Sequence, residues 1–227
     1  MLNGKMTKTE PMVRKVQKKY MIMRCSEGTK MEKENNYIRN LKMEEVPWDR
    51  ITTAYGTAKD FPEYFTALQE LTDLAQVSRA LGEITDQIEH QSTLWHATPF
   101  AMIFLVRSFE RAVDEWEKNE VAQYVVEKLL GFFEVIIDCV QDWNSMSDEE
   151  QEEPLPEFFD LLKEEYLLPE DCDEEEVDEW WEEGVLDDLL YSFYFYSHQM
   201  LLFCRPVLKR LENTPFQDAM EEVLKGL

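Results

Sequence analysis

Glycine, histidine and cysteine are scarce in this sequence, and each shortage narrows what the chain can be. It holds seven glycines, three histidines and four cysteines among 227 residues. Few glycines and no persistent alternation of apolar and polar residues argue against a sheet protein. Three scattered histidines are too few for a histidine-based metal centre, and no phosphate-binding loop, nucleophile elbow or HExxH motif occurs. The sequence therefore predicts no cofactor, no metal and no enzymatic activity.

The cysteines and the apolar runs indicate the compartment. The four cysteines form no CxxC motif, and Cys139 and Cys204 lie in apolar runs, where cysteine usually serves as a small buried hydrophobe. Residues 1–42 contain no apolar stretch long enough for a secretory signal. The longest later apolar run, Phe100–Val106, is too short to cross a bilayer. We therefore predict a cytoplasmic protein with reduced cysteines.

Basic residues are few, and their distribution is uneven. The chain holds 23 Lys and Arg against 48 Asp and Glu, a net charge of −25. Residues 1–42 carry eleven Lys and Arg and four Asp and Glu, a net charge of +7, which leaves −32 for residues 43–227. Such a body repels nucleic acid and anionic membranes and attracts basic proteins. The alternative is that the acids only maintain solubility.

The two charge regions correspond to two predicted parts of the chain. Residues 1–42 are polar and lack a core pattern, so we predict a mostly disordered basic tail. Residues 43–227 carry apolar residues at helical spacing, joined by short polar turns. Capping or proline signals mark five helix starts, at Asp60–Glu63, Thr98–Pro99, Ser147–Glu150, Pro156 and Thr214–Gln217. The prediction is a single all-α domain, a short α-solenoid of stacked antiparallel helical hairpins.

Individual residues predict how two of these helices begin and where a further helix is interrupted. The side chains of Asp60 and Thr98 are expected to cap their helices, because Asp and Thr accept hydrogen bonds from the free amides of a first turn. A further helix is predicted over Val185–Leu211, with a kink or break at Pro206.

The stretch Asp148–Asp188 is the most acidic part of the chain. It holds 21 Asp and Glu and a single base, Lys163. Aromatic and aliphatic residues recur through it at helical intervals, so we predict an ordered acidic helical insertion in which Pro156 opens a helix. The carboxylates from Asp171 to Glu182 are spaced as in a calcium loop, but the glycine that the sharp turn needs is missing, so no calcium site is predicted.

The pair Trp180-Trp181 lies within this insertion. Adjacent residues on a helix point about 100° apart, so one tryptophan can enter the core while the other stays near the surface. An exposed tryptophan among carboxylates would anchor a basic partner through cation–π contact and charge. Core filling is the alternative for at least one of them. The predicted protein-binding residues are Asp171, Asp173, Glu174, Glu175, Glu176, Asp178, Glu179, Trp180, Trp181, Glu182 and Glu183.

A resemblance to a known family covers Val46–Leu105. Its first half contains Trp48-Asp49, Tyr55-Gly56, Ala58, Asp60 and Pro62, and its second half contains His90-Gln91-Ser92-Thr93-Leu94-Trp95, Ala97-Thr98-Pro99, Ala101 and Phe104-Leu105. This pattern resembles a group of bacterial HEAT-repeat-like proteins, several of which are encoded beside secreted polymorphic toxins. The resemblance implies a HEAT-like α-solenoid and a role as a candidate immunity protein. It implies no catalytic residues.

The same residues also have a purely structural interpretation. The stretch His90–Thr93 is a polar turn whose side chains can satisfy the free backbone groups of the helices on either side. Thr98-Pro99 then starts the next helix. Two functions stay open: an immunity protein that neutralises a basic toxin, of which a nuclease is one kind, and a generic acidic α-solenoid scaffold or regulator. A toxin-like reading frame next to the gene would favour the first.

Overall fold

The computed structural model describes residues 38–146, 156–170, 172, 176–177, 180, 184, 186 and 189–227. The chain divides into two units, Met1–Leu41 and Lys42–Leu227. Most of the predicted disordered tail lies outside the described residues, so its disorder stays a prediction. The helices and strands given next lie in the second unit.

The described part of Lys42–Leu227 is mostly helical, which confirms the predicted all-α character. Its α-helices are α3 (Phe61–Glu70), α4 (Leu74–Ile88), α5 (Thr98–Glu115), α6 (Glu120–Met146), α8 (Leu190–Leu208) and α9 (Gln217–Gly226). Short 3-10 helices span Met43–Glu45, Phe158–Leu162, Glu164–Tyr166 and Lys209–Leu211. No helix in this part of the chain is both long and apolar enough to cross a membrane.

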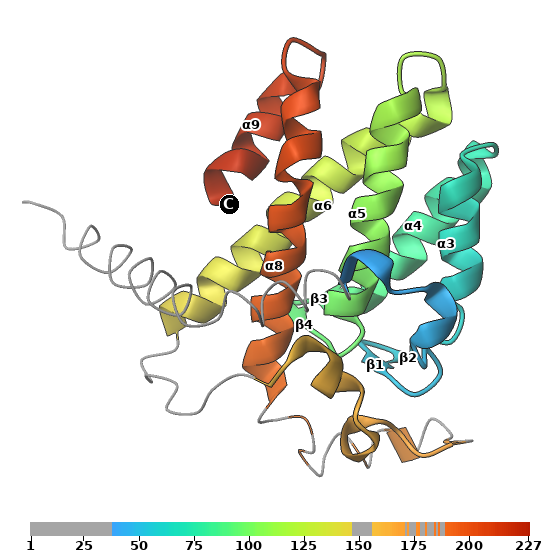
Figure 1. Cartoon of the computed structure of the whole chain (residues 1–227), viewed down its shortest axis with the longest axis vertical. Helices are drawn as coiled ribbons and strands as arrows, with labels where there is room; N and C mark the ends of the chain where they lie inside the picture. The colour runs from blue at the N-terminus through green and yellow to red at the C-terminus, as the bar shows by residue number, and fades with distance from the viewer. Residues whose placement is uncertain are drawn as a thin grey trace, which may run out of the picture. The chain divides into compact units, whose positions relative to one another are not determined.

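The helices pack in two adjoining rows. In one row α5 lies between α3 and α8 and contacts both, and in the other α6 contacts α4 and α9 (Figure 1). The rows are joined where α3 packs on α4, and where α6 passes behind α5 and α8 (Figure 1). Large apolar side chains fill the space between them, and the fully buried phenylalanines are Phe61, Phe65, Phe100, Phe109, Phe133, Phe158 and Phe193.

Side chains cap α4 and α6, but the capping residues are not those that the sequence predicted. Asp73 caps α4 by accepting hydrogen bonds from the amides of Ala75 and Gln76, and Asn119 caps α6 by accepting from those of Val121 and Ala122. The expected caps by Asp60 and Thr98 are wrong, since neither side chain accepts a bond from the first turn of its helix. Thr98 is already helical, and its hydroxyl is engaged elsewhere.

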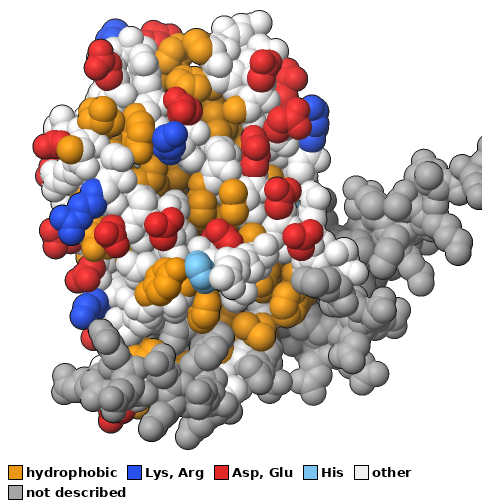
Figure 2. Space-filling view, turned by 180° about the vertical axis from the view of Figure 1, so that it is seen from behind, with side chains coloured by type: hydrophobic (Ala, Val, Ile, Leu, Met, Phe, Trp, Pro, Cys, Tyr) orange, Lys and Arg blue, Asp and Glu red, His pale blue; other side chains and the backbone are white. Residues whose placement is uncertain are grey.

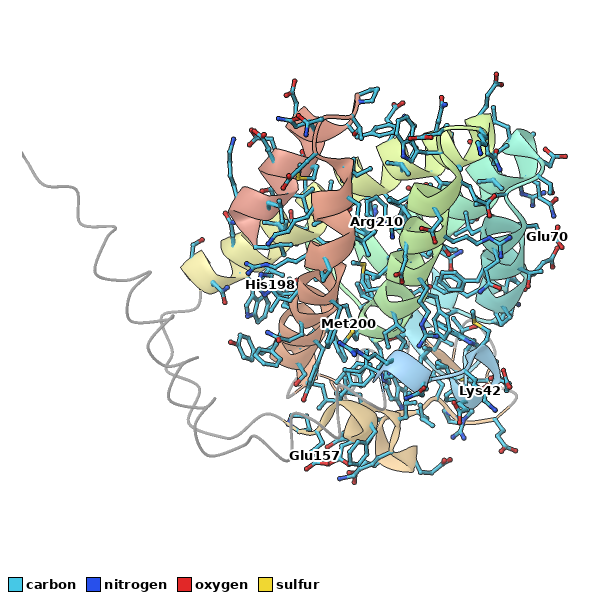
Figure 3. The ribbon with its side chains drawn as sticks, turned by 45° about the horizontal axis from the view of Figure 1, so that its top comes forward. Lys42, Glu70, Glu157, His198, Met200 and Arg210 are labelled. Carbon is cyan, nitrogen blue, oxygen red and sulfur yellow. The ribbon has the colours of Figure 1, made fainter. Side chains whose placement is uncertain are left out.

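The last long helix also differs from its prediction. It runs as α8 from Leu190 to Leu208, and Pro206 lies in its final turn, where the chain tightens into a 3-10 turn. Proline therefore ends the helix instead of breaking it in two. Figure 3 follows this helix from Met200, in its middle, to Arg210 beyond its end.

Two very short antiparallel hairpins interrupt the helices. Strands β1 (Thr52–Thr53) and β2 (Gly56–Thr57) precede α3, and β3 (Glu89–His90) and β4 (Thr93–Leu94) connect α4 to α5. The predicted polar turn His90–Thr93 is thus the tip of a hairpin. These hairpins matter because they bring the two halves of the sequence signature together.

The described acidic residues 156–170 do not form the α-helix predicted to open at Pro156. They form the two consecutive 3-10 helices Phe158–Leu162 and Glu164–Tyr166, joined by extended backbone at Lys163. Phe158, Leu161, Leu167 and Leu168 of this segment are buried in the core. The predicted insertion starts at Asp148, and residues 147–155 lie outside the described residues.

Candidate protein-binding surface

The two halves of the signature meet at one place in the fold. The amide of Ala97 donates to the carbonyl of Thr52 at 3.0 Å, and the amide of Ala54 donates to the carbonyl of Gln87 at 2.9 Å. These backbone bonds hold the β1–β2 hairpin against the end of α4 and the segment after β4. We call residues 48–58 and 87–98 together the hairpin junction.

Trp48 is the apolar centre of the inward side of the junction. It is almost fully buried, and its ring lies 5.6 Å from the rings of Phe61 and Phe104 and 5.9 Å from that of Phe65. Its indole nitrogen donates to the carbonyl of Met43 at 2.8 Å. The Trp-Asp start of the signature is therefore explained by packing.

Thr98 ties the end of one helix to the start of the next. Its buried hydroxyl donates to the carbonyl of Ile88, the last residue of α4, at 2.5 Å. The same oxygen accepts from the amide of Trp95 at 2.8 Å. The free carbonyl at the end of α4 is thus satisfied by this threonine, and not by the polar turn that was expected to do so.

The outward side of the junction carries an exposed aromatic pair. Tyr55, between β1 and β2, is 65% exposed, the highest value among the exposed large hydrophobic residues of the described chain. Its hydroxyl lies 3.0 Å from Nδ1 of His90, and the two rings meet edge to face at 5.2 Å. A tyrosine so exposed contributes little to the core, so its packing does not explain its presence.

The turn between β3 and β4 has a left-handed backbone at two residues that are not glycine. Gln91 has φ 52° and Ser92 has φ 62°. A two-residue turn of this kind favours Asn and Gly, because other side chains are strained there. Gln91 is exposed, and its side-chain amide has no hydrogen bond to any described residue.

Backbone bonds hold this turn in place. The amide of Ser92 donates to the carboxylate of Glu89 at 2.9 Å, and its carbonyl accepts from the Tyr194 hydroxyl at 3.0 Å. The Tyr194 hydroxyl in turn accepts from the amide of Leu94 at 3.3 Å. Burial raises the pKa of Tyr194, so the hydroxyl keeps the proton that it donates.

Carboxylates outnumber basic groups on the body. Burial raises the pKa of the Cys139 thiol to about 12, and the charges of Glu89, Asp142 and Asp138 raise it further. Figure 2 views the body from behind and shows Asp and Glu side chains far more often than Lys and Arg, with hydrophobic side chains between them.

Residues 156–170, which we call the strap, are held at one end by α8 and at the other by the segment before β1. Tyr196 donates to the carbonyl of Pro156 at 2.5 Å, and Nε of Arg50 donates to the carbonyl of Leu168 at 2.6 Å. The Arg50 guanidinium also pairs with both carboxylate oxygens of Glu164 and thereby lowers the pKa of Glu164. Glu157, at the start of the strap, lies well away from Arg210 (Figure 3).

His96 holds the middle of the strap. It is fully buried and stacks on Phe193 at 5.3 Å, and its Nε2 donates to the carbonyl of Leu161 at 2.8 Å. Burial lowers its pKa to about 4, so the ring is neutral at pH 7. Phe159, beside this contact, is 44% exposed and forms an apolar point on an otherwise charged segment. The strap is therefore anchored by neutral His96 and Tyr196 and by the Arg50 guanidinium, and it leaves Glu165 and Glu170 exposed.

The predicted binding residues are described only in small part. Glu176 is exposed and Trp180 is half-buried, which leaves open whether Trp180 is an anchor. The other predicted residues lie outside the described residues, and these are Asp171, Asp173, Glu174, Glu175, Asp178, Glu179, Trp181, Glu182 and Glu183. The structure instead draws attention to Gln91, which the sequence assigned to a structural turn, and to Tyr55, which the sequence indicated only as part of the resemblance. For Gln91 the available signal was a glutamine in a turn that suits asparagine or glycine.

The described residues contain no group of three or more His, Cys, Asp and Glu that could hold a metal ion. Cys139 and Cys204 are buried, and burial raises the pKa of both thiols, which leaves them unreactive. His198 also lies largely inside, and burial lowers its pKa.

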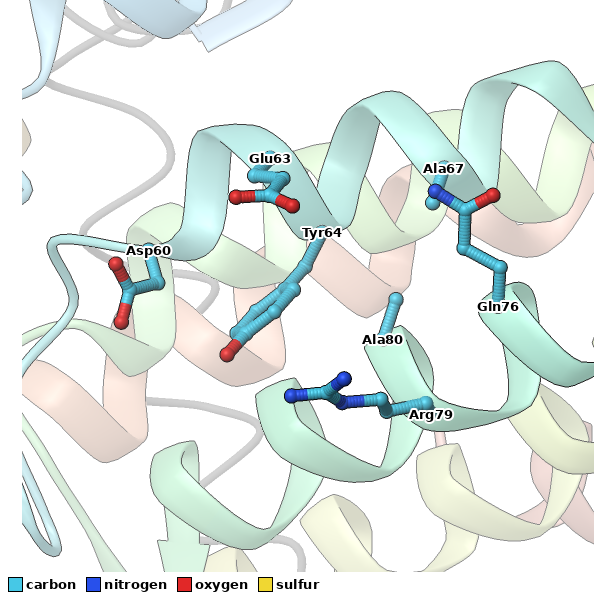
Figure 4. Close-up of a pocket in the computed structure, with 7 residues that line it drawn as sticks. All are labelled: Asp60, Glu63, Tyr64, Ala67, Gln76, Arg79 and Ala80. Atoms are coloured by element: carbon cyan, nitrogen blue, oxygen red, sulfur yellow. The ribbon is translucent and has the colours of Figure 1, made fainter.

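A polar cavity of about 350 Å³ lies between α3 and α4 (Figure 4). The buried residues Ala67 and Ala80 leave the space, because their side chains are small. Figure 4 shows the Tyr64 ring and the Arg79 side chain between these helices, with Asp60 and Glu63 on the α3 side. Opposite charges thus face the same space, and the cavity offers no single charge to a ligand.

Comparisons with protein-family models, curated proteins and solved structures find no match for this chain.

Proposed function

We propose that this chain is a non-catalytic protein-binding module whose partner is a basic protein. The observation that carries the proposal is the charge of the described surface. Within the described part of Lys42–Leu227 there are 29 Asp and Glu against 13 Lys and Arg. Aliphatic and aromatic side chains lie between those acids. Such a surface attracts a basic protein over distance and offers apolar contacts once it arrives.

The partner that we favour is a toxin, which makes the chain an immunity protein. Support comes from the resemblance of Val46–Leu105 to HEAT-repeat-like proteins encoded beside toxins. A nuclease is one suitable toxin, since the acidic body would cover the positive surface that binds phosphates. A generic acidic scaffold or regulator is the second candidate, and the acidic surface supports it equally.

We also propose that the helices form a short α-solenoid. The pairs α3–α4, α5–α6 and α8–α9 are consecutive along the chain, and members of one row pack side by side, as stacked hairpins do. A cytoplasmic location belongs to the same proposal. The buried free thiols of Cys139 and Cys204 suit a reducing compartment.

The test is to express the full chain together with each basic protein encoded beside its gene, beginning with any that is toxin-like. We expect a toxin-like product to co-purify with the chain and the chain to protect cells from it. Association measured by surface kinetics should slow as salt is raised, because exposed charges are screened over about 10 Å at 0.1 M. A basic partner that is not toxic would support the scaffold, and no complex with any neighbouring basic product would refute the toxin proposal.

The predicted residues of the acidic insertion are part of this test. Reversing Glu174, Glu175 and Glu176 to Lys should slow association more than it speeds dissociation, since exposed charges mainly govern encounter. Replacing Trp181 by Ala should instead speed dissociation if that residue is an anchor. Unchanged association of the lysine variant at every salt concentration would remove the insertion from the interface.

A further inference from the structure

We propose that the partner docks on the outward side of the hairpin junction, with Tyr55 as its apolar anchor and Gln91 as a contact that selects the partner. This inference rests on the proposed function, because it assigns the surface by which a basic protein would be bound. Three separate observations support it: an exposed aromatic pair, a strained turn and the excess of acids in the described body.

Tyr55 has the properties of an interface anchor. Exposed tyrosines that are held rigid supply much of the binding energy at protein interfaces, because little side-chain freedom remains to be lost. Here the ring is 65% exposed but is fixed by its hydroxyl contact with His90. The β1–β2 hairpin beneath it is held by backbone bonds to Gln87 and Ala97. The anchor is thus presented in a fixed orientation before the partner arrives.

The strained turn shows that something other than folding selects Gln91. A residue other than glycine in the left-handed region is strained, and such strain gathers where a side chain has a function. The Gln91 amide has no hydrogen bond to any described residue, so the fold gains nothing visible from it. Ser92 differs, since its own contacts are made by its backbone and would survive replacement.

The charge of the body decides the kind of partner. Glu89 of β3 precedes His90 directly, and the described part of Lys42–Leu227 holds 29 Asp and Glu against 13 Lys and Arg. An arginine or lysine beside Tyr55 would gain both cation–π contact with the ring and attraction from these carboxylates. An acidic partner would be repelled. The surface therefore fits a protein that presents basic side chains around an apolar contact.

The turn allows a matched test within one loop. Gln91→Gly and Ser92→Gly both relieve left-handed strain, but only the first removes the proposed contact. Both variants should melt at an unchanged or slightly higher temperature, by no more than about 4 °C. Binding of the purified neighbouring gene product should weaken about 10-fold for Gln91→Gly and stay unchanged for Ser92→Gly. Equal binding by the two variants would overturn the role of Gln91.

Tyr55 has its own control. Tyr55→Ala should weaken binding at least about 30-fold, as expected of an anchor. Leu74→Ala removes another exposed apolar residue, at the opposite end of α4, and should leave binding unchanged. If Tyr55→Ala binds as well as Leu74→Ala, the docking surface is elsewhere. If the unaltered full chain does not bind the product at all, the proposed function fails first, so the two failures are distinguishable.

Discussion

The inward and outward sides of the hairpin junction belong to the same sequence signature but differ in burial and in how far packing explains their residues. Inward residues such as Trp48 and Thr98 are buried, and each has a partner that its chemistry requires. Outward residues such as Tyr55 and Gln91 are exposed, and the fold gives no comparable reason for them. One signature can therefore contain residues that stabilise the fold and residues that are available for recognition. Substitutions on the inward side should lower stability, and substitutions on the outward side should not.

The largest expected effect lies on the inward side. Trp48→Ala should lower the free energy of unfolding by about 3–5 kcal/mol, because it opens a cavity among Phe61, Phe65 and Phe104. Urea unfolding of the purified variant measures the loss. Trp48→Phe, which keeps most of the volume, should cost clearly less. Near-native stability of Trp48→Ala would show that the junction is not part of the core.

The second effect concerns the hydroxyl that joins α4 to α5. Thr98→Val keeps the shape but leaves the carbonyl of Ile88 and the amide of Trp95 without their partner, which should cost about 2 kcal/mol. Thr98→Ser retains the hydroxyl and should cost less. Urea unfolding of both variants, compared with the unaltered chain, tests the bond, and equal losses would show that the methyl group matters more than the hydroxyl.

The third effect depends on pH and involves His96. Because the folded pKa of about 4 lies below the ordinary value of 6.5, the unfolded chain takes up the proton first. The stabilising contribution of neutral His96 is complete above pH 6.5 and is lost as pH falls toward 4. Between pH 7 and pH 5.5 this should amount to about 1 kcal/mol.

His96→Gln can still donate to the carbonyl of Leu161 but does not titrate. Its free energy of unfolding should therefore decline less between pH 7 and pH 5.5 than that of the unaltered chain, with other groups contributing equally to both. Parallel pH dependence of the two proteins would mean that His96 is not buried in its neutral form.

The smallest expected effect lies on the outward side. Tyr55→Ala should change the free energy of unfolding by no more than about 0.5 kcal/mol, because an exposed side chain contributes little to the core. Thermal and urea unfolding measure it. A loss of several kcal/mol would show that Tyr55 also stabilises the fold, so that the two sides of the junction do not differ in this respect.

The helices were predictable because their signals are local. Apolar residues spaced by one helical turn and proline near a helix start are read from neighbouring residues alone. The capping residue of a helix was not predictable in this way, because Asp60 and Asp73 have the same side chain. Only the backbone around each decides which carboxylate accepts hydrogen bonds from the first turn of its helix. The strap was mistaken for an α-helix for a related reason. Its apolar residues are spaced for a helix, but contacts with Arg50, His96 and Tyr196, all distant in sequence, hold it in 3-10 turns.

The sequence by itself determined an acidic helical body, because charge and apolar periodicity are properties of composition and short-range order. Only the tertiary structure decided which side of the signature faces solvent. Tyr55 and His90 are 35 residues apart, and their contact exists because the first hairpin packs against the end of α4. Whether a tyrosine fills the core or stands at the surface depends on such packing, and no local pattern encodes it.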